Sequence, residues 1–168
     1  MCDTTIPFTP SQQSLLDAIR DGNVELLKSL LQSGVNPDFF DDCDNPLALA
    51  LPHPECLRVL LESGADPKQT PFFTGGNGEI YTKSLLADFG YNIVDALSEN
   101  EELGSWLESL RILKKHLDLT TKYPTYYDGE MTLMEILYSA YYRHKHTPNE
   151  DEDFEDLLDE VRRVILTE

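Results

Sequence analysis

The 168-residue chain is poor in cysteine and has no long apolar run. Its cysteines, Cys2, Cys43 and Cys56, are odd in number and fall in no metal-ligand or disulfide spacing, which predicts reduced thiols. The longest uninterrupted apolar run, residues 47–51, is far too short to cross a bilayer, and the first residues lack the basic start of a secretory signal. We therefore expect a cytoplasmic protein with no membrane contact.

Basic residues are also scarce: 13 Lys and Arg face 31 Asp and Glu, for a formal net charge of −18. This balance opposes direct nucleic-acid binding, which depends on Lys and Arg that neutralise phosphates. An acidic surface instead favours basic partners, because charge steers association. The alternative is that the charge serves only solubility. The acidic run 150–156 fits a solvated face at the start of a final helix, where negative charge complements the helix dipole.

Recognisable catalytic or cofactor motifs are missing. The glycine-rich segment 75–78 is not followed by the Lys-Ser or Lys-Thr of a phosphate-binding loop. The acidic segment 38–49 lacks the glutamate that a calcium loop needs at its twelfth position, where Leu49 stands. His144 and His146 have no third ligand nearby and suit the basic end of a helix. We predict no catalytic residue, no metal, no cofactor and no enzymatic activity.

What the chain does contain is an internal repeat. The segment Leu30-Leu31-Gln32-Ser33-Gly34-Val35-Asn36-Pro37-Asp38 returns thirty positions later as Leu60-Leu61-Glu62-Ser63-Gly64-Ala65-Asp66-Pro67-Lys68. A period of this length is typical of stacked supersecondary units that bury their apolar faces against each other. Gly34 and Gly64 have the conformational freedom to end a helix, as has Gly22. The sequence therefore predicts short helices joined by repeated turns.

The repeated phrase resembles the ankyrin repeat, in which Leu-Leu and Gly-Ala-Asp end the second helix of each unit. Gly64-Ala65-Asp66 matches that wording, and Asn45-Pro46-Leu47-Ala48-Leu49-Ala50 is similar to the family's Thr-Pro-Leu-His-x-Ala opening. Thr9-Pro10-Ser11-Gln12 predicts a capped helix that begins at Pro10. The resemblance implies an all-α fold, an ankyrin-like α-solenoid of about four helix pairs with finger-like connecting loops.

The four expected repeats form one domain over residues 1–168 and span approximately residues 10–44, 45–80, 81–127 and 128–168. Pro52-His53-Pro54 shortens the second repeat, so its first helix should be a stub. We expect the third repeat to open at residues 84–87 and to have its second helix over 107–116, with an insertion between them. The fourth should open at residues 131–137 and end in an amphipathic helix whose apolar face holds Phe154, Leu157, Leu158, Val161, Val164 and Ile165.

The expected fingers combine aromatic pairs with carboxylates. In ankyrin proteins the finger tips and inner helices grip partners, and aromatic anchors among charges are typical of interface centres. One ring of each pair is expected to pack as core. The predicted partner-binding residues are Asp38, Phe39, Phe40, Asp41, Asp42, Asp44, Phe72, Phe73, Tyr126, Tyr127 and Asp128.

The resemblance and the charge together predict a protein-protein interaction module. The leading hypothesis is an acidic inhibitor of the immunity or antitoxin type, which covers the basic cleft of a toxin enzyme such as a nuclease. One alternative is an adaptor or host-directed effector that binds without inhibiting. Another treats residues 80–168 as a separate helical module that responds to a metal or carries an enzymatic activity.

Overall fold

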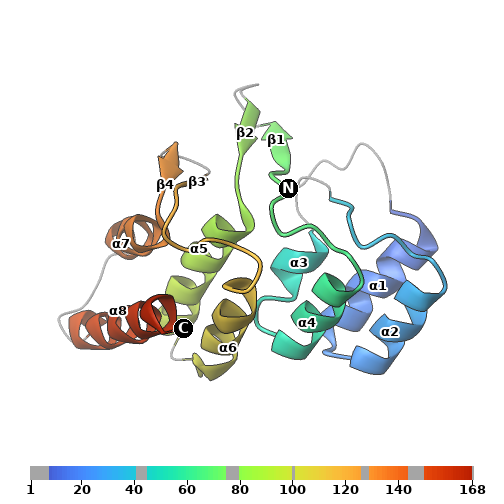
Figure 1. Cartoon of the computed structure of the whole chain (residues 1–168), viewed down its shortest axis with the longest axis horizontal. Helices are drawn as coiled ribbons and strands as arrows, with labels where there is room; N and C mark the ends of the chain where they lie inside the picture. The colour runs from blue at the N-terminus through green and yellow to red at the C-terminus, as the bar shows by residue number, and fades with distance from the viewer. Residues whose placement is uncertain are drawn as a thin grey trace.

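The computed structural model describes residues 8–40, 45–74, 80–99, 101–125, 129–143 and 150–167; for residues 72–74, 80, 150 and 151 only the backbone is described. These residues are mostly helical, as the all-α expectation requires (Figure 1). The elements are α1 (Pro10–Arg20), α2 (Val24–Gln32), α3 (Pro46–Leu49), α4 (Pro54–Glu62), β1 (Phe72–Thr74), β2 (Ile80–Thr82), α5 (Leu85–Ser98), α6 (Gly104–Leu113), β3 (Tyr123–Pro124), β4 (Glu130–Met131), α7 (Leu133–Arg143) and α8 (Glu150–Leu166).

The helices lie in two rows. α1, α3, α5 and α7 contact one another in that order and form the first row. α2, α4, α6 and α8 likewise form the second row. The rows are joined by contacts between α1 and α2, α3 and α4, and α7 and α8. Each helix therefore buries its apolar stripe against the neighbours in its own row and against the other row.

Each first-row helix begins at a side-chain cap. The caps are Thr9 before α1, Asn45 before α3, Ser84 before α5 and Thr132 before α7. Their side-chain oxygens accept first-turn N–H groups at distances from 2.9 to 3.4 Å. Such a cap stabilises a helix by about 1 kcal/mol. The expected start of α1 at Pro10 is confirmed, and α3 is the expected stub of four residues.

Three helices end in the same glycine turn. Gly22, Gly34 and Gly64 have positive φ angles of 61°, 95° and 95°. After α2 the Gly34 N–H donates to Leu31 and the next N–H donates to Leu30; the same two bonds follow α4. This Schellman arrangement satisfies carbonyl groups that a helix end leaves open, and glycine adopts it without a Cβ clash. The repeated phrase in the sequence thus encodes a repeated backbone turn.

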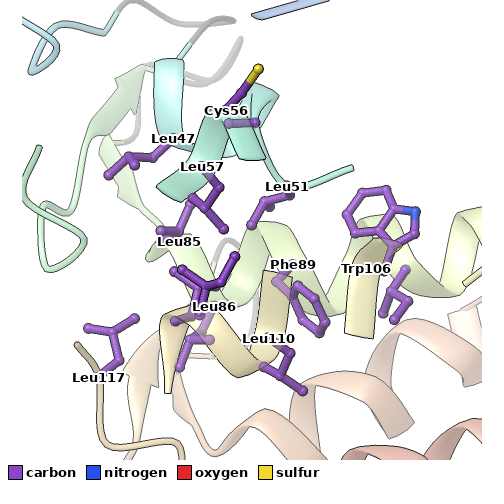
Figure 2. Close-up of a cluster of buried hydrophobic side chains, with 14 of the residues drawn as sticks. Leu47, Leu51, Cys56, Leu57, Leu85, Leu86, Phe89, Trp106, Leu110 and Leu117 are labelled. Atoms are coloured by element: carbon purple, nitrogen blue, oxygen red, sulfur yellow. The ribbon is translucent and has the colours of Figure 1, made fainter. Parts of the chain in front are cut away.

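One cluster of buried apolar side chains extends from α1 to α8. Figure 2 shows its centre, where Leu57 of α4, Leu86 and Phe89 of α5 and Leu110 of α6 come together. The rings of Phe89 and Trp106 meet edge to face with centroids 6.1 Å apart. Because this cluster crosses from one helix pair to the next, we expect the pairs to depend on each other for stability.

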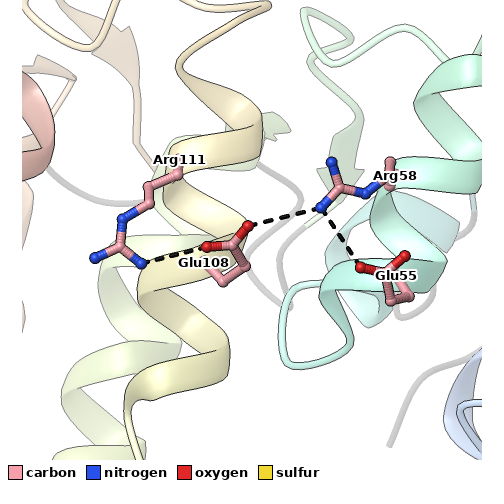
Figure 3. Close-up of polar contacts among 4 residues, drawn as sticks. All are labelled: Glu55, Arg58, Glu108 and Arg111. Atoms are coloured by element: carbon pink, nitrogen blue, oxygen red, sulfur yellow. Dashed lines mark hydrogen bonds and ion pairs between the residues drawn. The ribbon is translucent and has the colours of Figure 1, made fainter. Parts of the chain in front are cut away.

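A chain of ion pairs links α4 to α6 on the second row. Arg58 lies 3.4 Å from Glu55 of its own helix and 3.6 Å from Glu108 of α6, and Glu108 lies 3.3 Å from Arg111 (Figure 3). The side chains are roughly one-third to two-thirds exposed, so each pair contributes at most about 1 kcal/mol. Only the pair between Arg58 and Glu108 crosses from one helix to the other.

The second half differs in detail from the expectation. α5 has 14 residues and runs to Ser98, so it fills most of the segment expected as an insertion. α6 begins at Gly104 and ends at Leu113, shifted by about one turn from residues 107–116. The apolar face of α8 is as expected: its side chains at 154, 157, 158, 161 and 164 are buried.

Candidate functional site

The candidate site is the edge of the helix rows where the long connections lie. We call it the loop edge; its described residues are 33–40, 45, 63–74, 80–84, 114–125 and 129–132. Figure 1 shows both strand pairs projecting from this edge, at the top of the view, with the connection after α2 on the same side. The short turns between α1 and α2 and between α3 and α4, together with the connection between α5 and α6, form the opposite edge, the turn edge.

Three of these connections open with the same side-chain turn. The carboxamide of Asn36 accepts the Asp38 N–H at 3.0 Å, and the carboxylate of Asp66 accepts the Lys68 N–H at 2.9 Å. The carboxylate of Asp118 accepts the Thr120 N–H at 2.9 Å. Such an Asx turn redirects the chain without help from neighbouring segments. The loops therefore leave the second-row helices with a common local geometry.

The third of these turns carries a stabilised negative charge. The Thr120 hydroxyl also donates to the Asp118 carboxylate, at 2.7 Å. These two bonds, from the Thr120 side chain first and from its backbone second, lower the pKa of Asp118. Asp118 is exposed, so the loop edge presents a carboxylate that stays charged in mildly acidic solution.

Asp38 joins the first connection to the second. Its carboxylate accepts the N–H of Asp66 at 3.0 Å, across 28 positions of sequence. The neighbouring Phe39 is only 9% exposed, and its ring meets Phe8 edge to face with centroids 5.2 Å apart. Phe40 is 38% exposed. One ring of this pair thus packs as core, as expected, and Phe40 is the ring that a partner could reach.

The two later connections are β-hairpins that the sequence analysis did not predict. β1 pairs with β2 antiparallel, so Phe72 lies opposite Thr82 and Phe73 opposite Tyr81. β3 pairs with β4, so Tyr123 lies opposite Met131. The Ser84 N–H donates to the Pro124 carbonyl at 2.9 Å and thereby ties the second connection to the third. Successive connections are therefore held side by side.

A buried ion pair lies beneath the first hairpin. Asp88, in the first turn of α5, is 7% exposed and pairs with Lys83, which follows β2. Burial raises the pKa of Asp88, and the positive charge and hydrogen bond of Lys83 oppose that rise. The pair fixes the point where the hairpin enters α5. A buried charge that loses its partner is costly, so this contact constrains the loop edge.

The structure does not describe every predicted contact residue. Asp38, Phe39 and Phe40 are described. The prediction that Phe39 contacts a partner is wrong, because its ring is buried in the core. Only the backbone of Phe72 and Phe73 is described, at the pairing positions in β1. The other predicted contacts lie outside the described residues: Asp41, Asp42, Asp44, Tyr126, Tyr127 and Asp128.

Two features of this edge were not predicted from the sequence. The first is the Asp118 turn, which no glycine or Leu-Leu phrase precedes. Its available signal was an aspartate two residues before a threonine, the spacing of acceptor and donor in an Asx turn. The second is Phe8, whose contact with Phe39 joins segments 31 positions apart in sequence. That contact leaves no periodic trace in the sequence.

The described residues carry little that points to chemistry. Among them, no group of three or more His, Cys, Asp or Glu side chains is placed to hold a metal ion. Cys56 is buried and unpaired by any disulfide; burial, and to a lesser extent the charge of Glu55, raises the pKa of its thiol. Within the same residues no helix combines the length and the apolar character that crossing a membrane requires.

The loop edge therefore consists of adjacent loops that are hydrogen-bonded to one another and that expose carboxylates and the Phe40 ring. No protein-family model matches the chain, and no curated protein matches it in sequence.

Proposed function

We propose that this chain is an ankyrin-like solenoid that acts by binding another protein through the loop edge. The observation that carries this proposal is the run of connections on one edge, each opening with an Asx turn and bonded to the next. Two rows of helices that hold such loops in register are what a repeat protein needs to present an extended surface. The ankyrin-like phrases of the first two units support the same proposal.

The partner is proposed to be a basic protein. The net charge of −18 favours fast association with a positive surface and disfavours contact with phosphates. In the sharper form of the proposal, the chain is an inhibitor of the immunity type. It covers the positively charged substrate groove of a toxin enzyme, such as a nuclease, and competes there with the anionic substrate.

The test begins with affinity capture from source-cell lysate, followed by mass spectrometry and an activity assay of the captured protein. We expect one stoichiometric basic partner whose enzymatic activity is lost in the complex. A partner that keeps full activity would instead identify a non-inhibitory adaptor. Retention of no specific partner at low salt would contradict the binding proposal itself.

A matched pair of variants then locates the surface. Replacing Asp41, Asp42 and Asp44 by Asn removes three charges from the first finger. The control replaces Asp21, Glu25 and Glu99 by their amides, which removes three charges from the turn edge and the helix ends beside it. We expect the finger variant to slow association by about tenfold at low salt and the control to change it little. Equal effects of the two variants would show that only the net charge matters.

Phe40→Ala tests the apolar part of the same surface. Because Phe40 is 38% exposed, its truncation should lower the melting temperature less than truncation of the buried Phe39. If the ring is an interface anchor, dissociation should accelerate by about tenfold or more. Phe39→Ala is the contrasting variant: its ring is buried, so its loss should lower the melting temperature.

A further inference from the structure

A groove lies on the turn edge, far along α5 from the hairpins, between the α5–α6 connection and α8. Its volume is about 370 Å³. Leu97, Leu103 and Leu107 are half-buried at its floor, and the buried Leu157 of α8 completes it. These three half-buried leucines pack against the core on one side and face the groove on the other. The floor is therefore an apolar surface left open to a ligand.

The rim of this groove carries only negative charge. Glu101 stands on the α5–α6 connection, and Asp153, Asp156 and Glu160 stand on α8. Glu160 pairs with Arg163, whereas within the described part of the chain Glu101, Asp153 and Asp156 form no ion pair. None of the described lining residues is basic. Three of the four rim carboxylates therefore have no ion-pair partner among the described residues.

Helix stability does not account for the three rim carboxylates on α8. Positions 153, 156 and 160 are spaced so that their side chains line one face of α8. The helix dipole favours Asp153, which lies in the first turn, but its effect fades before Asp156 and Glu160. Like charges three and four positions apart destabilise a helix. A row of carboxylates beside an open apolar floor therefore indicates recognition of a ligand of the opposite charge.

We propose that this groove binds a basic amphipathic segment of a partner protein. An apolar side chain of that segment would cover the three half-buried leucines, and flanking Lys or Arg side chains would pair with Glu101, Asp153 and Asp156. Charge complementarity selects this occupant over a second copy of the chain, since two copies each carrying −18 repel. The inference does not rest on the function proposed for the loop edge.

The test is an NMR titration of the full chain with a synthetic amphipathic helix of leucine and lysine. The control peptide has the same composition in an order that gives no apolar face. We expect methyl shifts concentrated on Leu97, Leu103 and Leu107, and an affinity at least about tenfold higher than that of the control peptide. Shifts spread over all acidic faces, or equal affinity of the two peptides, would overturn the proposal.

Two double variants of α8 sharpen this test. Asp153→Asn with Asp156→Asn removes two of the four rim charges, whereas Glu152→Gln with Glu155→Gln removes the same amount of charge from exposed positions outside the groove. The rim variant should weaken peptide binding at least about fivefold more than the control variant. Equal weakening by the two variants would overturn the proposal. Leucine methyl shifts that change with protein concentration in the absence of peptide would also overturn it, because such shifts would assign the groove to a second copy of the chain. Circular dichroism of both variants checks that the fold is retained.

Discussion

The first two helix pairs and the last two use different residues to turn the chain after a second-row helix. Residues 10–68 use a repeated phrase, with glycine at positive φ after α2 and α4. After α6 there is no such glycine. There the Leu117 N–H donates to the carbonyl of Leu113, four positions earlier, whereas the corresponding bonds after α2 and α4 span five positions. Yet Asp118 forms the same side-chain turn as Asn36 and Asp66. The side-chain turn is therefore present even where the repeated sequence segment is absent.

The two halves also differ in the lengths of their first-row helices and of the connections that follow them. The first-row helices α1 and α3 have 11 and 4 residues, whereas α5 has 14 and is followed by a longer connection before α6. That connection supplies Leu103 and Glu101 to the acidic groove. The regular half of the molecule has no corresponding connection, because its turns at 21–23 and 50–53 are short. The departure from regularity therefore creates a surface that repetition alone would not.

Removal of a core side chain where the two halves meet should have the largest effect. Leu86→Ala empties a fully buried site in α5, next to Leu57 and Leu110 (Figure 2). We expect a loss of about 2–5 kcal/mol of unfolding free energy in urea titration. Hydrogen exchange should quicken in both halves together, since the core is continuous. Exchange that quickens only after residue 80 would show that the halves are independent.

The close approach of α5 to α7 is specific to the second half. A Cβ added at Gly90 would overlap Ile136 Cγ2, so Gly90→Ala should destabilise by about 1–3 kcal/mol. In an Ile136→Ala background the obstructing methyl group is gone, and Gly90→Ala should then cost much less. A double-mutant cycle by thermal or urea unfolding measures this coupling. Additive effects would contradict the close contact.

The glycine turns are specific to the first half. Gly34→Ala and Gly64→Ala force a side chain into φ 95° and should each destabilise by about 1–2 kcal/mol. Apart from the chain neighbours, no described residue lies within 4 Å of an added Cβ at either site, so the effect would be conformational. Gly104→Ala is the control, because the φ angle of Gly104 is not positive and the nearest described atom to its added Cβ is Glu102 Oε1 at 3.9 Å. A comparable loss for Gly104→Ala would refute the backbone explanation.

The buried Asp88 should give the second half a distinct pH response. Because burial raises its pKa above the ordinary value of 3.8, the native state holds this proton more tightly than the unfolded chain does. Its contribution to stability is therefore largest in acid and falls as the pH rises from 3.8 through the native pKa. The difference in unfolding free energy between the natural chain and Asp88→Asn should decrease over that range. A constant difference would contradict the raised pKa.

The smallest predicted effect concerns the Asp118 turn. Removing one of its hydrogen bonds with Thr120→Val should move the pKa of Asp118 upward, toward its ordinary range, while the backbone bond remains. Carboxyl-carbon NMR titration measures the shift. An unchanged pKa would mean that the threonine hydroxyl does not hold this carboxylate.

Local signals made much of the first half predictable. Thr9, Asn45 and the glycines at 22, 34 and 64 specify caps and turns through contacts only a few residues apart. The hairpins were missed because strands of two or three residues show no alternation. Burial of Phe39 and the meeting of Leu97 with Leu157 depend on segments distant in sequence. Such contacts follow from packing, and a single sequence does not display them.

The most direct measurement of the central claim is hydrogen exchange of the captured complex against the free chain. If the loop edge binds the partner, amides in residues 33–40, 63–74, 80–84 and 117–125 should gain protection in the complex. Amides of the turns at 21–23 and 50–53 should stay unchanged. Protection of those turns with an unprotected loop edge would contradict the account.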